Sequence, residues 1–203
     1  MYALVEDNNI TQIITNPKTM VIGDVRYPAK IFELWSQSEL NAIGIYEVIT
    51  DSTNYKDPAY YNNTNEQYTF ANGQVTKSWG TATAKRLNDE NAVDEDGNNI
   101  LEDGVQVINY GLKTEKKKIV KQQASGLLAP TDWYVVKSTE VADYDIPANI
   151  LSFRADVRSK SNEMETQIDN CTTVDELKAL YEYTEQEDGT FTRPLPEFPT
   201  EVI

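Results

Sequence analysis

Histidine is absent from this chain of 203 residues, and cysteine occurs once, as Cys171. Without histidine there is no Ser-His-Asp or Cys-His catalytic arrangement, no histidine ligand for zinc and no imidazole base near neutral pH. A single cysteine cannot form an intrachain disulfide, and its thiol is expected to be inert because no histidine can activate it. We therefore predict that the chain is not an enzyme and holds no catalytic, cofactor-binding or metal-binding residues.

Basic residues and long apolar runs are also scarce. The chain has 18 Lys and Arg against 33 Asp and Glu, a formal net charge of −15. That charge repels nucleic acid and anionic lipid, so neither is an expected partner, and the lysines at 116–118 and 121 are interpreted as a solvated helix face. No segment reaches the roughly 18 to 20 apolar residues that span a bilayer, and the first residues lack a signal-peptide pattern. We therefore expect that the chain is synthesised in a cytoplasm and does not insert into a membrane.

The residues that are present predict an α+β fold with two lobes. A mainly antiparallel β lobe with one short helix is expected over residues 1–86, followed by an acidic loop or linker over 87–111. A helical lobe, built on a helix hairpin and one long helix, is expected over 112–185. The three prolines after residue 193 predict an extended tail over 186–203, which either packs along a surface or hangs free.

Turn and cap signals define the first lobe. Residues 7–9 (DNN) and 71–73 (ANG) are typical of tight hairpins between strands. Ser36 and Glu39 have the spacing of a capping box, and Gly44 suits a left-handed helix end, so a helix is predicted over 37–43. The aromatic residues expected in the core, rather than on a ligand-stacking platform, are Trp35, Tyr46, Tyr68, Phe70 and Trp79.

The acidic segment over 86–104 contains a partial calcium-loop pattern. Asp94, Asp96 and Asn98 alternate as oxygen ligands would, but the twelfth position of such a loop is Val105 instead of glutamate. An acidic turn without a bound metal is the preferred interpretation.

The second lobe is dominated by helical patterns. A helix over 112–128 is stopped by Ala129-Pro130, after which Thr131 is expected to cap a short segment. A long helix is predicted over 147–168 with Pro147 at its first position, and a second capping box, Thr173 to Glu176, begins the last helix. The long helix has an apolar stripe spaced four, three, four, comprising Ile146, Ile150, Phe153, Val157, Ser161, Met164 and Ile168.

The stripe and its neighbours are the candidate protein-interaction residues. The stripe is expected to pack either against residues 112–128 or against other copies of the chain. Ser161 allows a close helix approach, and Trp133 is expected to plug the junction between helices. Arg154 and Arg158 either cover the edge of the stripe and pair with local acids or clamp carboxylates of a neighbouring subunit. The candidates are Trp133, Ile150, Phe153, Arg154, Val157, Arg158, Ser161, Met164 and Ile168.

The order of these motifs resembles tail-fibre-associated and tail-fibre-assembly proteins of tailed, marine-type bacteriophages. The resemblance rests on LLAPTDWYVV, Ile146-Pro147, Phe153-Arg154 and Arg158, and on YPAKIFELWSQSELNAIGIYEV in the first lobe. The chain departs from the family at 193–196 (RPLP), where many of these proteins have a Trp-Pro tail. The family includes both particle components and folding helpers.

The resemblance implies a structural protein of the virion in the tail, baseplate or fibre-attachment region. Its partners would be other phage tail proteins and copies of itself, with a trimer as one option because fibre-region proteins are often threefold. One alternative is a tail-fibre assembly chaperone that is absent from the mature virion. Another, from a different class, is a glycan-binding or carboxylate-based glycan-hydrolysing tail domain, which needs acids beside exposed aromatic rings.

Overall fold

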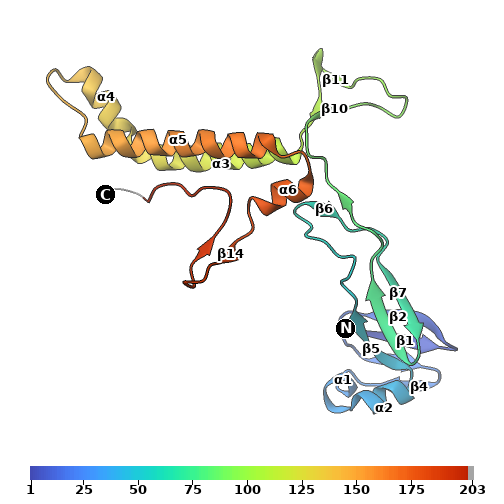
Figure 1. Cartoon of the computed structure of the whole chain (residues 1–203). Coiled ribbons are helices and arrows are strands. Elements are labelled where there is room, and N and C mark those ends of the chain that lie inside the picture. The colour runs from blue at the N-terminus through green and yellow to red at the C-terminus, as the bar shows by residue number, and fades with distance from the viewer. Residues whose placement is uncertain (201–203) are drawn as a thin grey trace. The chain divides into compact units, whose positions relative to one another are not determined.

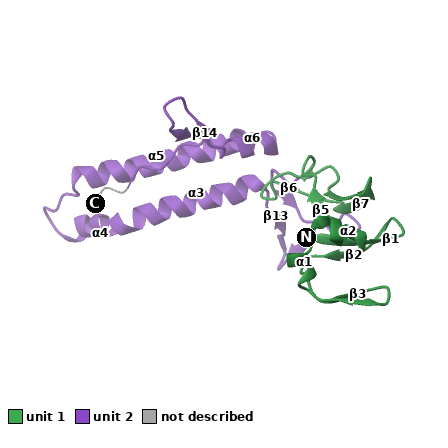
Figure 2. Ribbon diagram, turned by 90° about the horizontal axis from the view of Figure 1, so that it is seen from below, with its two compact units in different colours: residues 1–83 green, residues 84–203 purple. Residues whose placement is uncertain are grey.

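The computed structural model describes residues 1–200 and confirms an α+β protein. The chain divides into two compact units, residues 1–83 and 84–203 (Figure 2). The first unit is rich in strands, and the second contains the long helices (Figure 1). The division lies close to the predicted end of the first lobe, but the predicted linker belongs to the second unit.

A five-stranded sheet forms the body of the first unit. Its order is β2 (Asn9–Ile14), β1 (Tyr2–Glu6), β5 (Ile45–Thr50), β8 (Gln74–Ser78) and β7 (Gln67–Ala71). All neighbours are antiparallel except β5 and β8, which are parallel. Both predicted hairpins are confirmed, because Asn8 and Asn72 adopt the positive φ angles, 63° and 52°, that such turns require.

Short elements complete the first unit. They are β3 (Met20–Ile22), which pairs with β4 (Val25–Tyr27), the helices α1 (Ile31–Leu34) and α2 (Gln37–Ala42), and the two-residue strand β6 (Tyr61–Asn62). Strand β6 pairs with β9 (Thr83–Ala84), whose second residue begins the second unit. The capping box of α2 is confirmed: the Ser36 hydroxyl accepts from the Glu39 amide at 3.3 Å, and the Glu39 carboxylate accepts from the Ser36 amide at 2.7 Å. Helix α1 was not predicted, since only one short helix was expected here.

The two faces of the sheet bury separate apolar clusters. Alternation along β1 sends Leu4 to one cluster and Ala3 and Val5 to the other. Trp35 packs against the first cluster, and Tyr46, Tyr68 and Phe70 pack against the second, all partly buried. Trp79 belongs to neither cluster: its ring packs against that of Tyr55 at a tilt of 56°, with centroids 4.7 Å apart.

The acidic segment at the start of the second unit is more ordered than expected. It contains β10 (Glu90–Asn91) paired with β13 (Ile108–Asn109), and β11 (Leu101–Glu102) paired with β12 (Val105–Gln106). The Asp94 carboxylate accepts hydrogen bonds from the amides of Asp96 and Asn98 at 3.0 and 2.8 Å. These bonds, above all the one from Asn98, lower the pKa of Asp94. Backbone amides are therefore bound to the Asp94 carboxylate, which is the group that would have to coordinate a cation in this loop.

The helices of the second unit are α3 (Leu112–Leu128), α4 (Asp132–Glu140), α5 (Ala148–Asn170) and α6 (Val174–Ala179), with a 3-10 turn, η1 (Ala129–Thr131), between α3 and α4. Helices α3 and α5 lie side by side as a hairpin (Figures 1 and 2). Helix α5 begins one residue later than predicted, because Pro147 is extended, with ψ 137°, and serves as its N-cap. The capping box of α6 is confirmed.

The C-terminal segment packs on the helices. After α6, β14 (Thr184–Glu185) pairs with β15 (Phe191–Thr192). Leu195 is 2% exposed, and its amide donates to the Leu180 carbonyl at 3.0 Å, while Phe198 packs against the cluster that contains Phe153. The tail was expected either to pack along a surface or to hang free, and the structure shows that it packs. Residues 201–203 of that prediction lie outside the described residues.

Candidate protein-interaction site

The apolar stripe of α5 is buried within the chain. The stripe residues within α5 have exposed fractions from 0% for Val157 and Ile168 to 7% for Ser161, whereas Ile146 precedes α5 and is only partly buried. Phe153 and Val157 share a cluster with Ala124 of α3. The predicted contact with residues 112–128 is therefore the observed one, and the candidates Ile150, Phe153, Val157, Ser161, Met164 and Ile168 are covered while the helices remain paired.

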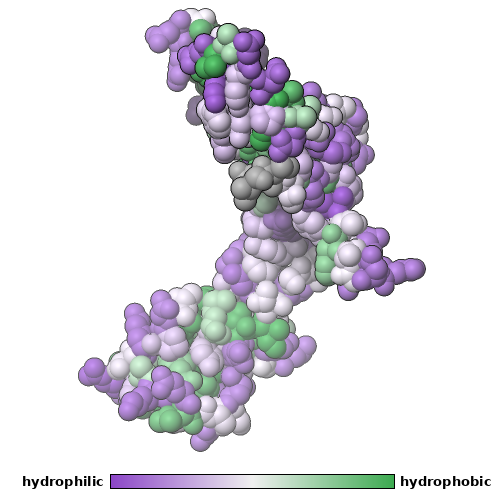
Figure 3. Space-filling view, turned by 90° about the vertical axis from the view of Figure 1, so that its left-hand side faces the viewer, coloured by the Kyte–Doolittle hydropathy of each residue, from purple (hydrophilic) through white to green (hydrophobic). Residues whose placement is uncertain are grey.

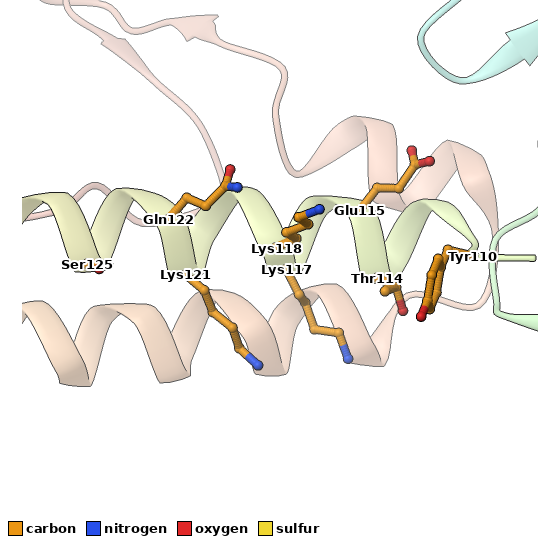
Figure 4. Close-up of a pocket in the computed structure, with 8 residues that line it drawn as sticks. All are labelled: Tyr110, Thr114, Glu115, Lys117, Lys118, Lys121, Gln122 and Ser125. Carbon is orange, nitrogen blue, oxygen red and sulfur yellow. The ribbon is translucent and has the colours of Figure 1, made fainter. Parts of the chain in front are cut away.

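Lysines of α3 strengthen this pairing. Lys117 and Lys121 point from α3 toward α5 (Figure 4). The Lys117 Nζ lies 2.7 Å from the Asp169 carboxylate, and the Lys121 Nζ lies 3.3 Å from that of Glu165. With their neighbours they line an open hollow of about 760 Å³ on α3. The predicted solvated face is correct for Lys118, which is exposed, whereas Lys117 is half-buried in an ion pair between helices.

Arg154 is a buried cation rather than a stem at the edge of the stripe. It is 6% exposed, and its Nη2 lies 2.8 Å from the Asp132 carboxylate at the start of α4. Its Nη1 donates to the Leu128 carbonyl at 3.0 Å and to the Thr131 hydroxyl at 2.5 Å. One guanidinium therefore joins the end of α3, the η1 turn and the start of α4. The prediction that Arg154 pairs with a local acid is wrong, because its partner Asp132 lies 22 residues earlier in the chain.

The helix ends reinforce the Arg154–Asp132 pair. The guanidinium binds a carbonyl at the C-terminal end of α3, where the helix dipole is negative, and Asp132 lies in the first turn of α4, where it is positive. Thr131 does not cap α4 with its side chain, contrary to the prediction. Its hydroxyl instead donates to the Leu128 carbonyl at 2.8 Å and accepts from Arg154.

Arg158 lies one turn further along α5 and is exposed. Its Nη1 donates to the Arg154 carbonyl at 3.3 Å, and it forms no ion pair within residues 1–200. With Lys121, Arg154 and Ser161 it lines a shallow hollow of about 440 Å³. Arg154 and Arg158 thus have separate roles, since the first is fully engaged inside the chain and the second faces solvent.

Helix α4 has no buried residue. Trp133 is 51% exposed, so the prediction that it plugs the helix junction is wrong. Thr131 and Arg154 fill that position, and the Trp133 ring stacks instead on Tyr134, with centroids 3.8 Å apart. Lys137 Nζ lies 5.6 Å from the centroid of the Trp133 ring and 4.1 Å from that of Tyr144.

The apolar side chains of α4 and its C-cap form an exposed surface, here named the α4 surface. Its members are Trp133, Val135, Val136 and Val141. Trp133 and Val136 are three apart and share one helix face, with Glu140 one turn beyond Val136, whereas Val135 faces the opposite side of the helix. Figure 3 views this end of the helical hairpin in its upper part, where apolar atoms lie among polar ones. Clustered exposed apolar residues mark surfaces that bind other molecules.

Sequence reasoning found only one member of the α4 surface. It selected Trp133, for a buried role, and missed Val135, Val136 and Val141. The available signal was the run WYVV in a short helix that carries no apolar stripe of its own. A helix without an apolar stripe has no side suited to packing on a hydrophobic core, so its apolar residues are left exposed.

Two other candidate sites have structural explanations. Cys171 is buried, and burial, followed by the nearby Glu176 charge, raises the pKa of its thiol, in agreement with an inert cysteine. In the first unit Lys77 lies 4.8 Å from the Trp79 ring centroid, and the Glu66 carboxylate binds the Lys77 ammonium at 2.9 Å. That ion pair, with the Tyr68 hydroxyl, lowers the pKa of Glu66. This carboxylate is engaged in holding the β7–β8 hairpin.

Comparison with models of protein families, with curated proteins and with solved structures finds no match to this chain. Within residues 1–200, no three His, Cys, Asp or Glu side chains gather into a possible metal site. No helix in the same part of the chain is both long and apolar enough to cross a membrane.

Proposed function

We propose that this protein is a structural component of a tailed-phage virion, in the tail, baseplate or fibre-attachment region, and that it acts by binding other tail proteins rather than by catalysis. The phage assignment rests on the resemblance of the motif order around 127–159 to tail-fibre-associated proteins. The observation that carries the binding role is α4, a nine-residue helix without one buried residue that exposes Trp133 and two valines.

A helix of this kind is unusual unless a partner covers it. Helices in water gain most of their stability from burying an apolar face, and short isolated helices are marginal. Helix α4 buries none of its residues, so its apolar side chains contribute little to folding of the isolated chain. Contact with another protein would supply that burial.

The same packing bears on self-association. A trimer formed through the long-helix stripe would need the stripe to be exposed, but Val157 and Ile168 are 0% exposed within the chain, and Val157 packs with Ala124 of α3. A homo-oligomer therefore requires a different surface, such as a strand edge of the first unit.

Mass spectrometry of purified particles tests the proposal. Peptides of this chain are expected in particles that have been banded by density and washed in high salt. Their absence, with the chain present in lysates of infected cells, would instead favour the alternative of a tail-fibre assembly chaperone. Detection of the chain only as a contaminant removed by the salt wash would also count against a structural role.

A further inference from the structure

We propose that α4 and the loop that follows it are a recognition element for a groove on a partner protein, and that this groove has an apolar floor and a rim of Lys and Arg. The inference rests on the proposed binding role and adds the chemistry of the partner. It is carried by the charges that surround the α4 surface.

The α4 surface has an acidic border. Glu140, Asp143 and Asp145 are exposed and make no ion pair within the described residues. Asp132 adds a fourth acid, but its charge is matched by Arg154 at 2.8 Å. The only cation of α4 is Lys137, which lies against the rings of Trp133 and Tyr144.

This border selects among possible occupants. An isologous contact with the same surface of a second copy would bring the same acids together, and like charges at an interface disfavour that pairing. An anionic lipid surface and nucleic acid are disfavoured for the same reason. A groove with apolar side chains on its floor and cations around it would bury Trp133 and Val136 and match the three acids.

The element is also pre-positioned for such a contact. Arg154 holds the first residue of α4, and Lys137 over the Tyr144 ring connects α4 with the loop that follows. Asp143 adopts a positive φ of 62°, which fixes the turn of that loop. Pre-positioning lowers the entropy cost of binding, and a tryptophan is among the residues that most often dominate an interface.

Photo-crosslinking in the phage-producing host tests the inference. The full chain would carry benzoylphenylalanine in place of Val136, with the same replacement of Ile119 as the control, because Ile119 is 46% exposed on α3 away from the α4 surface. Mass spectrometry would identify the cross-linked residues. We expect position 136 to link to one protein segment in which apolar residues are flanked by Lys or Arg.

Two charge-reversal variants distinguish the effect of the acids beside the α4 surface from the effect of the net charge of the whole chain. One is Glu140→Lys with Asp145→Lys, and the other is Glu185→Lys with Glu187→Lys on the β14–β15 hairpin. Each changes two acids to two bases, so each moves the formal net charge from −15 to −11. We expect the first to weaken cross-linking from position 136 by about tenfold or more, and the second by less than about threefold.

Several results would overturn the inference. They are a cross-link to another copy of this chain or to lipid, a cross-linked segment without Lys or Arg, equal effects of the two variants, or no cross-link above that of position 119. The identity of the partner tests the proposed function separately. If the cross-linked partner has a basic groove but is absent from particles, this inference holds and the proposed virion role is contradicted.

Discussion

The Asp89 carboxylate caps helix α3 from 22 residues away in the sequence. Its Oδ1 accepts a hydrogen bond from the Gly111 amide at 2.7 Å, and its Oδ2 accepts one from the Thr114 hydroxyl at 2.9 Å. Gly111 is the N-cap of α3 and has no side chain to do this itself. A Cβ there would also lie 2.5 Å from the Asn88 carbonyl, so the close approach of this segment requires glycine.

This cap predicts a pH dependence. The Gly111 bond, helped by Thr114 and Lys117, lowers the pKa of Asp89 below its value in the unfolded chain, about 3.9. The stabilisation is therefore fully present above about pH 4 and is lost as pH falls through the lowered folded-state pKa. Asp89→Asn should be less stable than the parent at neutral pH, and the difference should shrink in acid.

Urea unfolding followed by circular dichroism between about pH 6 and pH 2 would measure this difference. Glu95→Gln is the control, since the Glu95 carboxylate is exposed and accepts no hydrogen bond among residues 1–200. A stability difference for Asp89→Asn that stays constant down to the lowest pH would show that the charge of Asp89 does not contribute.

Gly44 gives a second prediction. Its φ is +84°, and a Cβ at this position would lie 2.6 Å from the Val5 carbonyl oxygen. Gly44→Ala should lower the free energy of unfolding by about 1–3 kcal/mol, because of left-handed strain and the clash. Gly126→Ala on α3 is the matched substitution with nothing within 4 Å, and it should raise that free energy by about 0.5–1 kcal/mol. Urea denaturation of both variants would check this, and effects of the same sign would contradict it.

Short-range rules predicted much of the fold. Both capping boxes, both hairpins and the buried stripe of α5 depend on residues within one or two turns of each other, so their signals are present in the local sequence. The failures involve distant partners. The sequence places Asp89 in an acidic linker, and the prediction for Trp133 depends on the rule that an aromatic residue beside a helix end is buried.

The candidate site shows the same division. The stripe was found because its spacing is local, but the pattern could not say that α3 covers it. Arg154 was placed at the edge of the stripe, although its partner Asp132 is 22 residues earlier in the chain. The exposure of α4 depends on which elements fail to cover it, and no local pattern encodes that.

Burial of the α5 stripe gives a third prediction. Ile168 is 0% exposed, so Ile168→Ala should cost about 2–5 kcal/mol through lost burial and a cavity. Ile119→Ala should stay within about 0.5 kcal/mol, since that side chain is 46% exposed on α3. Denaturant unfolding of the two variants measures both values. A small effect at Ile168 would mean that the stripe is not the core of the hairpin.

The last prediction concerns Arg154. Arg154→Met removes its bonds to Leu128, Thr131 and Asp132 and should cost about 1.5–3 kcal/mol, the range for hydrogen bonds to a charged group. Asp132→Asn should cost less, because its side chain is 61% exposed and solvent screens the pair. Both variants should speed amide hydrogen exchange in residues 129–141 more than in α3 or α5, since Arg154 is the residue that holds the start of α4.

Arg158→Met is the matched control for Arg154→Met. Arg158 is on the same helix, one turn away, and its side chain makes a single 3.3 Å bond to a backbone carbonyl. Its removal should leave exchange in residues 129–141 unchanged and stability within about 0.5 kcal/mol. If Arg154→Met instead raised exchange equally throughout α3, α4 and α5, Arg154 would be a general core residue, and the position of α4 would have to depend on other contacts.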